Sequence, residues 1–238
     1  MSNFAVVMET VYEDNHIIIV NKAPGEIVQG DRTGDEPLVE TVKRYLKEKY
    51  AKPGNVFCGV VHRLDRPVGG LVVFARTSKA LARMNEMFRL GEVRKRYWAI
   101  TRNRPPKDCD TLEHYITTRQ EGNKSFASDK PTDDAKRAVL DYKLLASSDR
   151  YHLLEVNLHT GRKHQIRVQL SKIGCPIKGD LKYGDKRSNP DGSISLQAHS
   201  IEFVHPVSKK VVSVTAPLPQ NDALWQAFGE LLSEKPNC

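Results

Sequence analysis

The stretch "GVVHRLDRPVGGLVVFARTSKA", residues 59–80, passes from a polar loop to an apolar run and then to a helical pattern. Residues 70–75 are apolar and rich in β-branched side chains, which favours a short buried strand. A helix is expected directly after this strand, because Thr77 or Ser78 can cap its N-terminus and Gly91 can end it. A strand that leads at once into a helix is the first indication of a fold that mixes the two.

Similar patterns continue on both sides of this stretch. A helix is expected over residues 37–50, with Pro37 in its first turn, and a short helix over residues 163–174. Residues 103–136 are polar and are expected to form hairpins and loops. Further strands are expected over residues 16–25, 97–101, 138–145, 151–159, 196–206 and 210–217. The pattern predicts an α+β fold in which two helix-and-strand halves are joined through one continuous sheet.

The composition is that of an ordinary globular protein. The 238 residues are 39% hydrophobic and 28% charged, and no apolar run approaches the ~20 residues that a membrane span needs. The first residues lack the basic and apolar regions of a signal peptide. The four cysteines are scattered, without a C-x-x-C pair, which argues against disulfides and zinc and for a reducing cytoplasm.

The formal net charge of +8 has two interpretations, a solvated basic surface or a polyanionic partner. Positive charge is concentrated in RKRY at 94–97, GRKHQIR at 161–167 and SKK at 208–210. Two of these clusters adjoin aromatic or apolar segments. This arrangement favours a nucleic acid as the partner.

Asp65 stands between Arg63 and Arg66. Such a group is commonly a surface salt bridge of little energetic value. Here, however, Pro67 restricts the loop, Gly69–Gly70 allows close backbone approach, and the apolar strand provides a rigid support. The arginines would keep the carboxylate ionised and attract phosphates. Asp65 is therefore a candidate catalytic carboxylate.

Arg167 is the second candidate. In the helix expected over residues 163–174 it lies beside an apolar stripe and shares a face with Lys163, four residues earlier. An arginine at the edge of a buried face needs a carboxylate partner. That partner is either an acidic residue that stabilises the fold or Asp65, 102 positions earlier. The apolar stripe consists of Ile166, Leu170 and Ile173.

Several segments together resemble the RluA-type pseudouridine synthases. They are VYEDNHIIIVNKAPG (11–25), HRLDRPVGGLVVFARTSKA (62–80), KRYWAI (95–100), the segment of residues 155–184 that contains HTGRKHQIR, and LQAHSIEFVHP (196–206). They follow in the family's order and cover most of residues 11–219. Two departures are the NKAPG segment, where the family more often has D-K-P-x-G, and the weakly matching residues 103–136.

The resemblance implies a pseudouridine synthase fold, which is α+β with a central mixed, mostly antiparallel sheet, flanking helices and an active-site cleft. It implies one catalytic domain over residues 1–238, with its core at 11–219. Because a strand begins near Val11, we expect no separate N-terminal RNA-binding domain. The implied activity is isomerisation of specific uridines to pseudouridine in rRNA or tRNA, by a monomer without cofactor or metal.

The resemblance also implies roles for individual residues. Asp65 corresponds to the nucleophilic aspartate, Tyr97 to the active-site tyrosine and Arg167 to the active-site arginine. We expect four residues to bind substrate, namely Arg63, Arg66, Lys163 and Leu196. Other interpretations remain for Arg63 as a solvated arginine, for Tyr97 as a half-buried strand residue and for Leu196 as core. His62 is expected to be structural.

The reaction breaks the N1–C1′ bond, turns the uracil and rejoins it through C5. Nothing is oxidised or added, which fits a sequence without a Rossmann fingerprint, P-loop or zinc spacing. A carboxylate can act by covalent attack or by stabilising cationic charge at C1′. The base must first leave its stack, at a cost of a few kcal/mol, and Arg63 is expected to fill the gap.

Two other functions fit part of the sequence. An RNA-binding or RNA-folding module would use the basic surface without turnover, but it would need none of Asp65, Tyr97 and Arg167 in a specific geometry. A nucleoside glycosylase would use a carboxylate near C1′ and release free base, which an isomerase does not.

Overall fold

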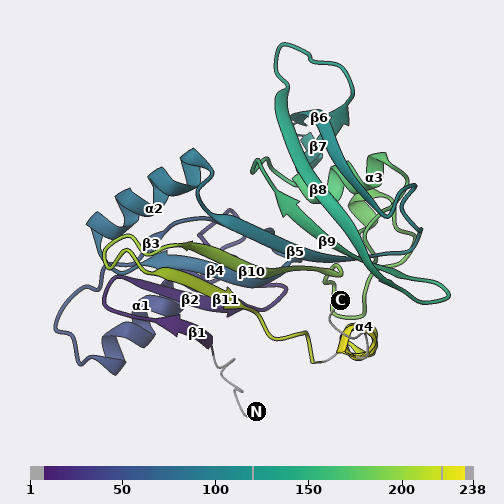
Figure 1. Cartoon of the computed structure of the whole chain (residues 1–238). Coiled ribbons are helices and arrows are strands. Elements are labelled where there is room, and N and C mark those ends of the chain that lie inside the picture. The colour runs from purple at the N-terminus through teal and green to yellow at the C-terminus, as the bar shows by residue number, and fades with distance from the viewer. Residues whose placement is uncertain (1–7, 120, 221, 234–238) are drawn as a thin grey trace. The chain divides into compact units, whose positions relative to one another are not determined.

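The computed structural model describes residues 8–119, 121–220 and 222–233. It divides into two compact units. The first unit consists of residues 1–93 and 200–216, and the second of residues 94–199 and 217–238. The chain thus leaves the first unit, builds most of the second, and returns. Figure 1 shows the elements of both units.

The sheet of the first unit is built around two central strands, β2 (Ile17–Lys22) and β4 (Gly69–Ala75). These strands are antiparallel, with Ile17 opposite Ala75 and Lys22 opposite Gly70. The strand order is β1-β2-β4-β10, with β3 on β4 and β11 on β10. The remaining bounds are β1 (Glu9–Glu13), β3 (Gly59–Val60), β10 (Leu196–Val204) and β11 (Val211–Thr215).

Side chains of the central strands alternate between two cores, because successive residues of a strand point to opposite faces. One core contains Ile17 and Ile19 together with residues of helix α2 (Ser78–Leu90). The other contains Ile18 and Val20 together with residues of helix α1 (Leu38–Lys49). Both central strands are therefore buried on both faces, which explains their unbroken apolar sequences.

Helix α2 has the expected ends. The Thr77 hydroxyl accepts a hydrogen bond from the Ala80 N–H at 3.1 Å. Gly91 ends the helix in the left-handed region at φ 75°, where glycine has no Cβ penalty. Met84 is fully buried and belongs to the core that this helix covers.

The second unit has the strand order β5-β9-β8-β6-β7. These strands are β5 (Arg94–Thr101), β9 (His152–Leu158), β8 (Lys136–Ser147), β6 (Cys109–Arg119) and β7 (Lys124–Ser128), and their printed pairings are antiparallel. Its helices are α3 (Gln165–Lys172), α4 (Ala223–Ser233) and the short 3₁₀ turns η1 (Glu121–Asn123) and η2 (Leu181–Tyr183). The described elements confirm the α+β class with a mostly antiparallel sheet.

Each long helix of the second unit covers its own core. Val168 of α3 packs with Ile116, Ala138 and Tyr183. Trp225 and Phe228 of α4 pack with Ile100, Ala146 and Leu153.

Several expected boundaries differ from the structure. Strand β1 begins at Glu9 rather than near Val11. Strand β5 begins at Arg94 rather than Tyr97, so the basic cluster is part of the strand. Residues 103–136 contain the expected hairpin, but one strand of it, β6, is eleven residues long. Helix α4 was not expected.

The helix expected over residues 163–174 is shorter, and the expectation that Lys163 shares a helical face with Arg167 was wrong. Helix α3 begins at Gln165, because His164 adopts a left-handed conformation at φ 55°. Lys163 lies before the helix and shares no helical face with Arg167. Pro37 is likewise the residue before α1 rather than part of its first turn.

Within the described residues, none of the helices combines the length and the apolar character that a membrane crossing requires.

Candidate active site

The loop that carries Asp65 joins β3 to β4 and is fixed at two points. The Val68 N–H donates to the Asp65 carbonyl at 3.0 Å, which closes a tight turn, and the Gly25 N–H donates to the Arg66 carbonyl at 2.8 Å. The Asp65 side chain is half-buried. A carboxylate held in this way is supported by the buried strand that follows, as the sequence predicted.

Lys22 lies beneath this loop and was missed as a site residue. Its side chain is buried, and Nζ donates to the carbonyls of Ala23 at 2.9 Å, Glu26 at 2.9 Å and Arg66 at 3.1 Å. Burial lowers the pKa of Lys22 to about 8, while the charges of Glu26 and Asp65 act in the opposite direction. A cation is thus kept close to Asp65 by neutral backbone groups. A lysine at the end of a strand that begins with four apolar residues was the available signal.

Gly69 allows the loop to approach the end of β2. A Cβ at this position would lie 3.3 Å from Cδ of Pro24 and 3.4 Å from the carbonyl oxygen of Lys22. The adjacent Gly70 has φ 111°, a conformation that glycine adopts without strain. The predicted close approach is confirmed at Gly69.

The two loop arginines differ. Arg66 donates to the Thr33 hydroxyl at 2.8 Å and pairs with Asp35 at 2.7 Å and with Asp31 at 3.7 Å. It therefore joins the Asp65 loop to the acidic loop of residues 31–35. Arg63 has an exposed side chain, so it is accessible to a ligand.

His62 has the structural role that the sequence suggested. Its Nε2 accepts a hydrogen bond from the Val73 N–H at 3.1 Å, and its ring stacks on Phe88 with the centroids 5.0 Å apart. Since Nε2 accepts, it carries no proton in this arrangement. The ring thus connects the loop to the backbone of β4 at Val73.

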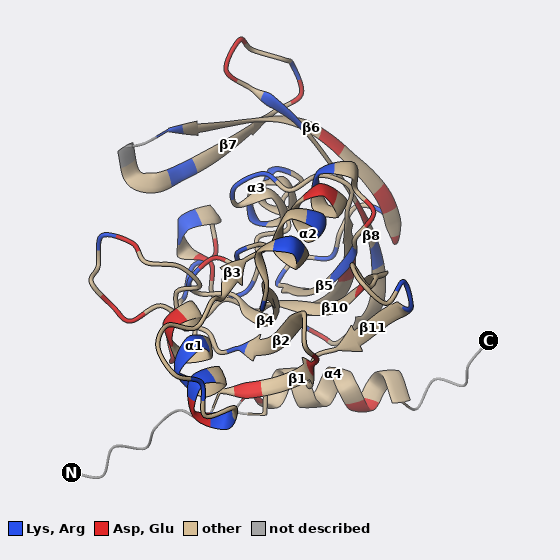
Figure 2. Ribbon diagram, turned by 90° about the vertical axis from the view of Figure 1, so that its left-hand side faces the viewer, with Lys and Arg blue, Asp and Glu red and all other residues tan. Residues whose placement is uncertain are grey.

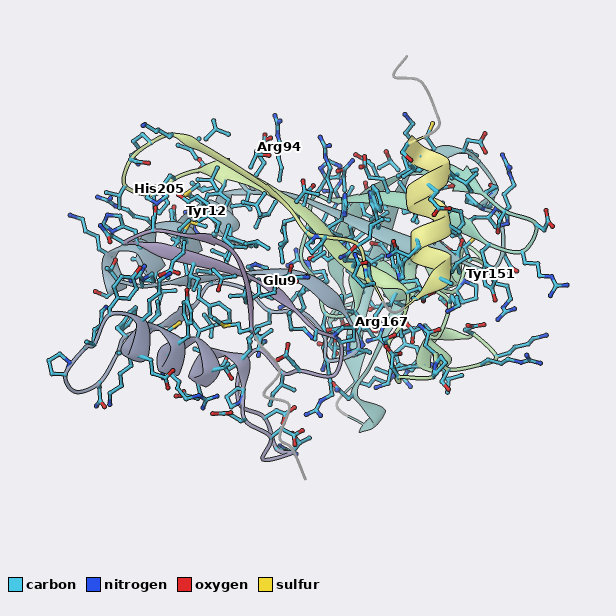
Figure 3. The ribbon with its side chains drawn as sticks, turned by 90° about the horizontal axis from the view of Figure 1, so that it is seen from below. Glu9, Tyr12, Arg94, Tyr151, Arg167 and His205 are labelled. Atoms are coloured by element: carbon cyan, nitrogen blue, oxygen red, sulfur yellow. The ribbon has the colours of Figure 1, made fainter. Side chains whose placement is uncertain are left out.

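Arg167 lies in the first turn of α3 and is buried; Figure 3 labels it. Its Nε donates to Oδ2 of Asp180 at 2.7 Å, and Nη2 donates to Oδ1 at 2.9 Å. This bidentate pair is the fold-stabilising partner that we considered for Arg167. A guanidinium carries five N–H donors, of which Asp180 accepts two. Asp65 belongs to the other unit, and its pairing with Arg167 stays a prediction.

The surroundings of the pair are themselves polar and ordered by hydrogen bonds. The guanidinium carbon of Arg167 lies 4.9 Å from the ring centroid of Tyr183. The Tyr183 hydroxyl accepts from the Ser125 N–H at 2.8 Å and is hydrogen-bonded to Nδ1 of His164 at 2.7 Å. Arg167 is therefore oriented from two sides, by a carboxylate and by an aromatic ring.

Asp180 and Tyr183 were missed as site residues, although both lie within the segment of residues 155–184 that carries the resemblance. The Asp180 carbonyl accepts from the N–H groups of Tyr183 at 3.1 Å and Asp185 at 3.0 Å. The Asp185 carboxylate in turn accepts from the Gly179 N–H at 2.6 Å. The signal was an acidic residue thirteen positions after a buried arginine, within the same motif.

The other expected residues of the second unit divide by exposure. Tyr97 lies on β5 opposite Val156 of β9 and is 8% exposed. Leu196 begins β10 and is buried. Lys163 is exposed, and its Nζ donates to Oδ1 of Asn123. Of these three expected residues, the tyrosine and the leucine are thus buried and the lysine is exposed.

The basic cluster at the start of β5 alternates in exposure. Arg94, labelled in Figure 3, and Arg96 are exposed, while Lys95 is partly buried and burial lowers its pKa. Burial, together with the charge of Arg96, lowers the pKa of His199 to about 4. The His199 ring stacks on Trp98 at 3.7 Å between centroids. The cluster thus presents two arginines to solvent.

Among the described residues, no three His, Cys, Asp or Glu side chains are grouped so that they could hold a metal ion.

The chain resembles known proteins over most of its length. Residues 16–172 match the family described as RNA pseudouridylate synthase. The chain is 31% identical to ribosomal large subunit pseudouridine synthase D of Zymomonas mobilis, over 90% of this chain and 70% of that protein. It is 30% identical to tRNA pseudouridine synthase C of Pectobacterium carotovorum, over 92% and 60%.

Among solved structures, the protein titled Human RNA Pseudouridylate Synthase Domain Containing 4 matches with a TM-score of 0.77 at 25% identity, over 96% of this chain and 95% of that chain. The chain spans about two thirds of the length of the curated relatives that it matches.

Replacement of Lys22 by Met tests the support of the Asp65 loop. The variant leaves three carbonyls without their donor, so we expect a loss of about 2 kcal/mol in unfolding free energy at pH 7. The folded-state pKa of about 8 lies below the unfolded value of 10.5, so the unfolded wild type binds more protons between these pH values. Wild-type stability relative to the variant should therefore rise from about pH 8 toward pH 10.5.

Urea unfolding at pH 7 and pH 9.5 measures both effects, with Lys43→Met, a half-exposed lysine paired with Glu40, as the control. A difference between wild type and Lys22→Met that shrinks at pH 9.5 would contradict this account of Lys22.

Replacement of Asp180 by Asn tests the buried pair. It removes the negative partner that holds Nε and Nη2 of the buried Arg167 guanidinium, so we expect a loss of about 3 kcal/mol in unfolding free energy. The control is Asp108→Asn, which removes an exposed pair with Arg104 and should cost less than about 1 kcal/mol. Equal losses for the two variants, measured by urea unfolding, would show that the buried pair does not stabilise the second unit.

Proposed function

Because the chain belongs to the RNA pseudouridylate synthase family, we propose that it isomerises specific uridines of rRNA or tRNA to pseudouridine, with Asp65 as the catalytic carboxylate. The observation that carries this proposal is the support of Asp65 by a doubly buried strand, a closed turn and the Lys22 ammonium. Asp65, Tyr97 and Arg167 all lie within the residues that match the family.

In the proposed reaction the N1–C1′ bond breaks while the Asp65 carboxylate attacks or stabilises the electron-poor centre. The uracil then turns, and C5 forms the new bond to C1′. The C5 proton leaves and N1 takes up a proton, so the product is an isomer of the substrate. Tyr97 would provide a flat face for the uracil and a hydroxyl near C5.

Arg167 is proposed to orient Asp65 and keep it ionised. Asp180 holds Nε and Nη2 of the guanidinium, and the Tyr183 ring restricts its position. A fixed guanidinium can direct its remaining N–H groups at a second carboxylate with little loss of entropy. The pair with Asp180 thus supports, rather than replaces, the proposed pairing with Asp65.

Substrate binding is proposed for four further residues. Arg63 is exposed next to Asp65 and would occupy the space that the extruded uridine leaves. Arg66 and Lys163 would contact phosphates, and Leu196 would pack against the base. We propose that the enzyme acts as one catalytic domain and as a monomer in the cytoplasm. The free thiols of Cys58, Cys109 and Cys175 fit a reducing compartment.

Replacement of Asp65 by Asn should abolish pseudouridine formation and leave RNA affinity within about tenfold, because Asn keeps the shape and loses the charge and the nucleophile. The assay follows tritium release from C5-labelled uridine in rRNA and tRNA of a strain that lacks the gene. Asp149→Asn, an exposed carboxylate, is the control. Turnover by Asp65→Asn would refute the assignment, and released uracil would indicate a glycosylase.

Replacement of Arg167 by Lys keeps the charge but loses the planar fork. Because small errors in catalytic geometry cost about 100-fold in rate, we expect kcat to fall by at least that factor while RNA affinity changes little. Single-turnover rates and filter binding separate the two effects, at a temperature where the variant is folded. A variant with near-normal kcat would remove Arg167 from the proposed site.

A further inference from the structure

We propose that the tip of the β6–β7 hairpin binds an unpaired stretch of the substrate RNA. The hairpin tip consists of Arg119, Lys124 and Phe126 on the hairpin and of Lys163 and Lys182, which contact its turn. The Phe126 ring would stack on a base, and the four cations would contact the adjacent phosphates. This inference rests on the proposed function only for the identity of the RNA as substrate.

Phe126 is the aromatic component of the hairpin tip. It lies on β7, the last strand in the order of the second unit, opposite Thr117 of β6. Its neighbour Ser125 is fully buried, whereas Phe126 is 40% exposed. The phenyl ring therefore projects from the face opposite to the buried one. An accessible ring on a sheet is a surface on which an unstacked base can lie.

Two cations accompany this ring. The guanidinium carbon of Arg119 lies 4.9 Å from the ring centroid and Nζ of Lys124 lies 5.8 Å from it. The two residues are opposite each other in the strand register. Their attraction to the ring keeps both charges beside it, where they can reach the phosphates on either side of a stacked base. Figure 2 shows blue segments along the β6–β7 hairpin.

Two more cations are held at the turn. Lys163 Nζ donates to the Asn123 side chain, and Lys182 Nζ donates to the carbonyls of Gly122 and Asn123, both at 3.3 Å. Their hydrogen-bond partners are neutral groups, so the positive charges remain. Backbone and amide contacts thus position two ammonium groups beside Arg119 without neutralising them.

The hairpin tip carries an excess of positive charge. None of its four cations makes an ion pair with a carboxylate among the described side chains. Several other exposed arginines do: Arg44 with Glu36, Arg89 with Glu86, Arg104 with Asp108 and Arg137 with Glu113. The four cations outnumber the two acidic residues of this region, Glu121 in the turn and Asp134 in the adjoining cavity, and this excess of positive charge favours a polyanion as the partner.

A cavity of about 390 Å³ adjoins the hairpin tip at Lys163. Three cations line it, together with Ile116, Thr118, Gly161 and the single carboxylate of Asp134. These cations are Lys136, Arg162 and Lys163. Ile116 and Thr118 lie on the face of β6 opposite to that of Thr117, which pairs with Phe126. The cavity therefore offers a second basic site for a phosphate, on the other face of the hairpin from the ring. The combination of an exposed ring with phosphate-binding groups fits single-stranded RNA, because the base faces of a duplex are covered.

The first experiment uses a single-stranded RNA oligonucleotide that contains 2-aminopurine. Stacking on Phe126 should quench its fluorescence, and Phe126→Ala should abolish the quenching and weaken binding about 5- to 150-fold. The control is Phe57→Ala, which removes an equally exposed phenyl ring, 46% exposed, from the first unit. Phe126→Leu retains an apolar side chain without the ring, so it should lose the quenching even if Phe126→Ala fails to fold.

The second experiment measures how much the cations of the hairpin tip contribute to RNA binding. The double variant Arg119→Gln with Lys124→Gln should lower the slope of log affinity against log salt by about 1.4, since each phosphate contact on a single strand contributes about 0.7. The control is Lys43→Gln with Arg89→Gln, two cations that are already paired with glutamates. A duplex RNA should compete weakly for the binding.

Wild-type affinity, quenching and salt slope in these variants would overturn the proposal, as would equal competition by duplex RNA. These outcomes are independent of the proposed function. If tritium release still depends on Asp65, the enzyme assignment stands while the hairpin-tip proposal falls. If the wild type forms no pseudouridine but binds RNA through Phe126, the hairpin-tip proposal stands and the enzyme assignment falls.

Discussion

The pairing of β2 with β4 is the constraint on which the Asp65 loop depends. Both strands are buried on both faces, so neither can shift its register without moving apolar side chains out of a core. The register sets Lys22 opposite Gly70, directly under the loop. The loop inherits this rigidity through the contacts of its backbone with Lys22 and Gly25. The position of the candidate catalytic carboxylate thus depends on the packing of β2 and β4, several residues away from Asp65 in the chain.

The two buried cations show two solutions to the same energetic problem. Lys22 is surrounded by neutral carbonyl groups, so its pKa falls and its charge is held at some cost. Arg167 is paired with a full carboxylate in a matching geometry. The lysine can lose its proton under mild alkali, whereas the arginine cannot. The first therefore makes its unit sensitive to mildly alkaline pH, and the second fixes a side-chain geometry through two hydrogen bonds.

Local signals predicted the elements that depend on local chemistry. The strand at 70–75 and the helix after it were predictable, because a cap, an apolar stripe and a terminal glycine specify that helix. The early end of α3 was not, since no propensity identifies His164 as left-handed. Asp65 could be selected from its loop, but Asp180 could not be selected as the partner of Arg167. The spacing points to the loop after α3, but that loop also contains Asp185, and which carboxylate reaches the guanidinium depends on how the loop folds back.

The return of the chain to the first unit has a consequence for biosynthesis. Residues 200–216 supply Ile201, Phe203, Val212 and Ala216 to the core that α2 covers. A nascent chain that has emerged only to residue 93 therefore lacks four of the twelve buried residues of that core, and it cannot complete the sheet from its own residues. By the time residues 200–216 are made, residues 94–199 of the second unit already exist, and it lacks only residues 217–238. Although domains generally fold from the N-terminus during translation, here the support of Asp65 is completed after the surroundings of Arg167 have been made.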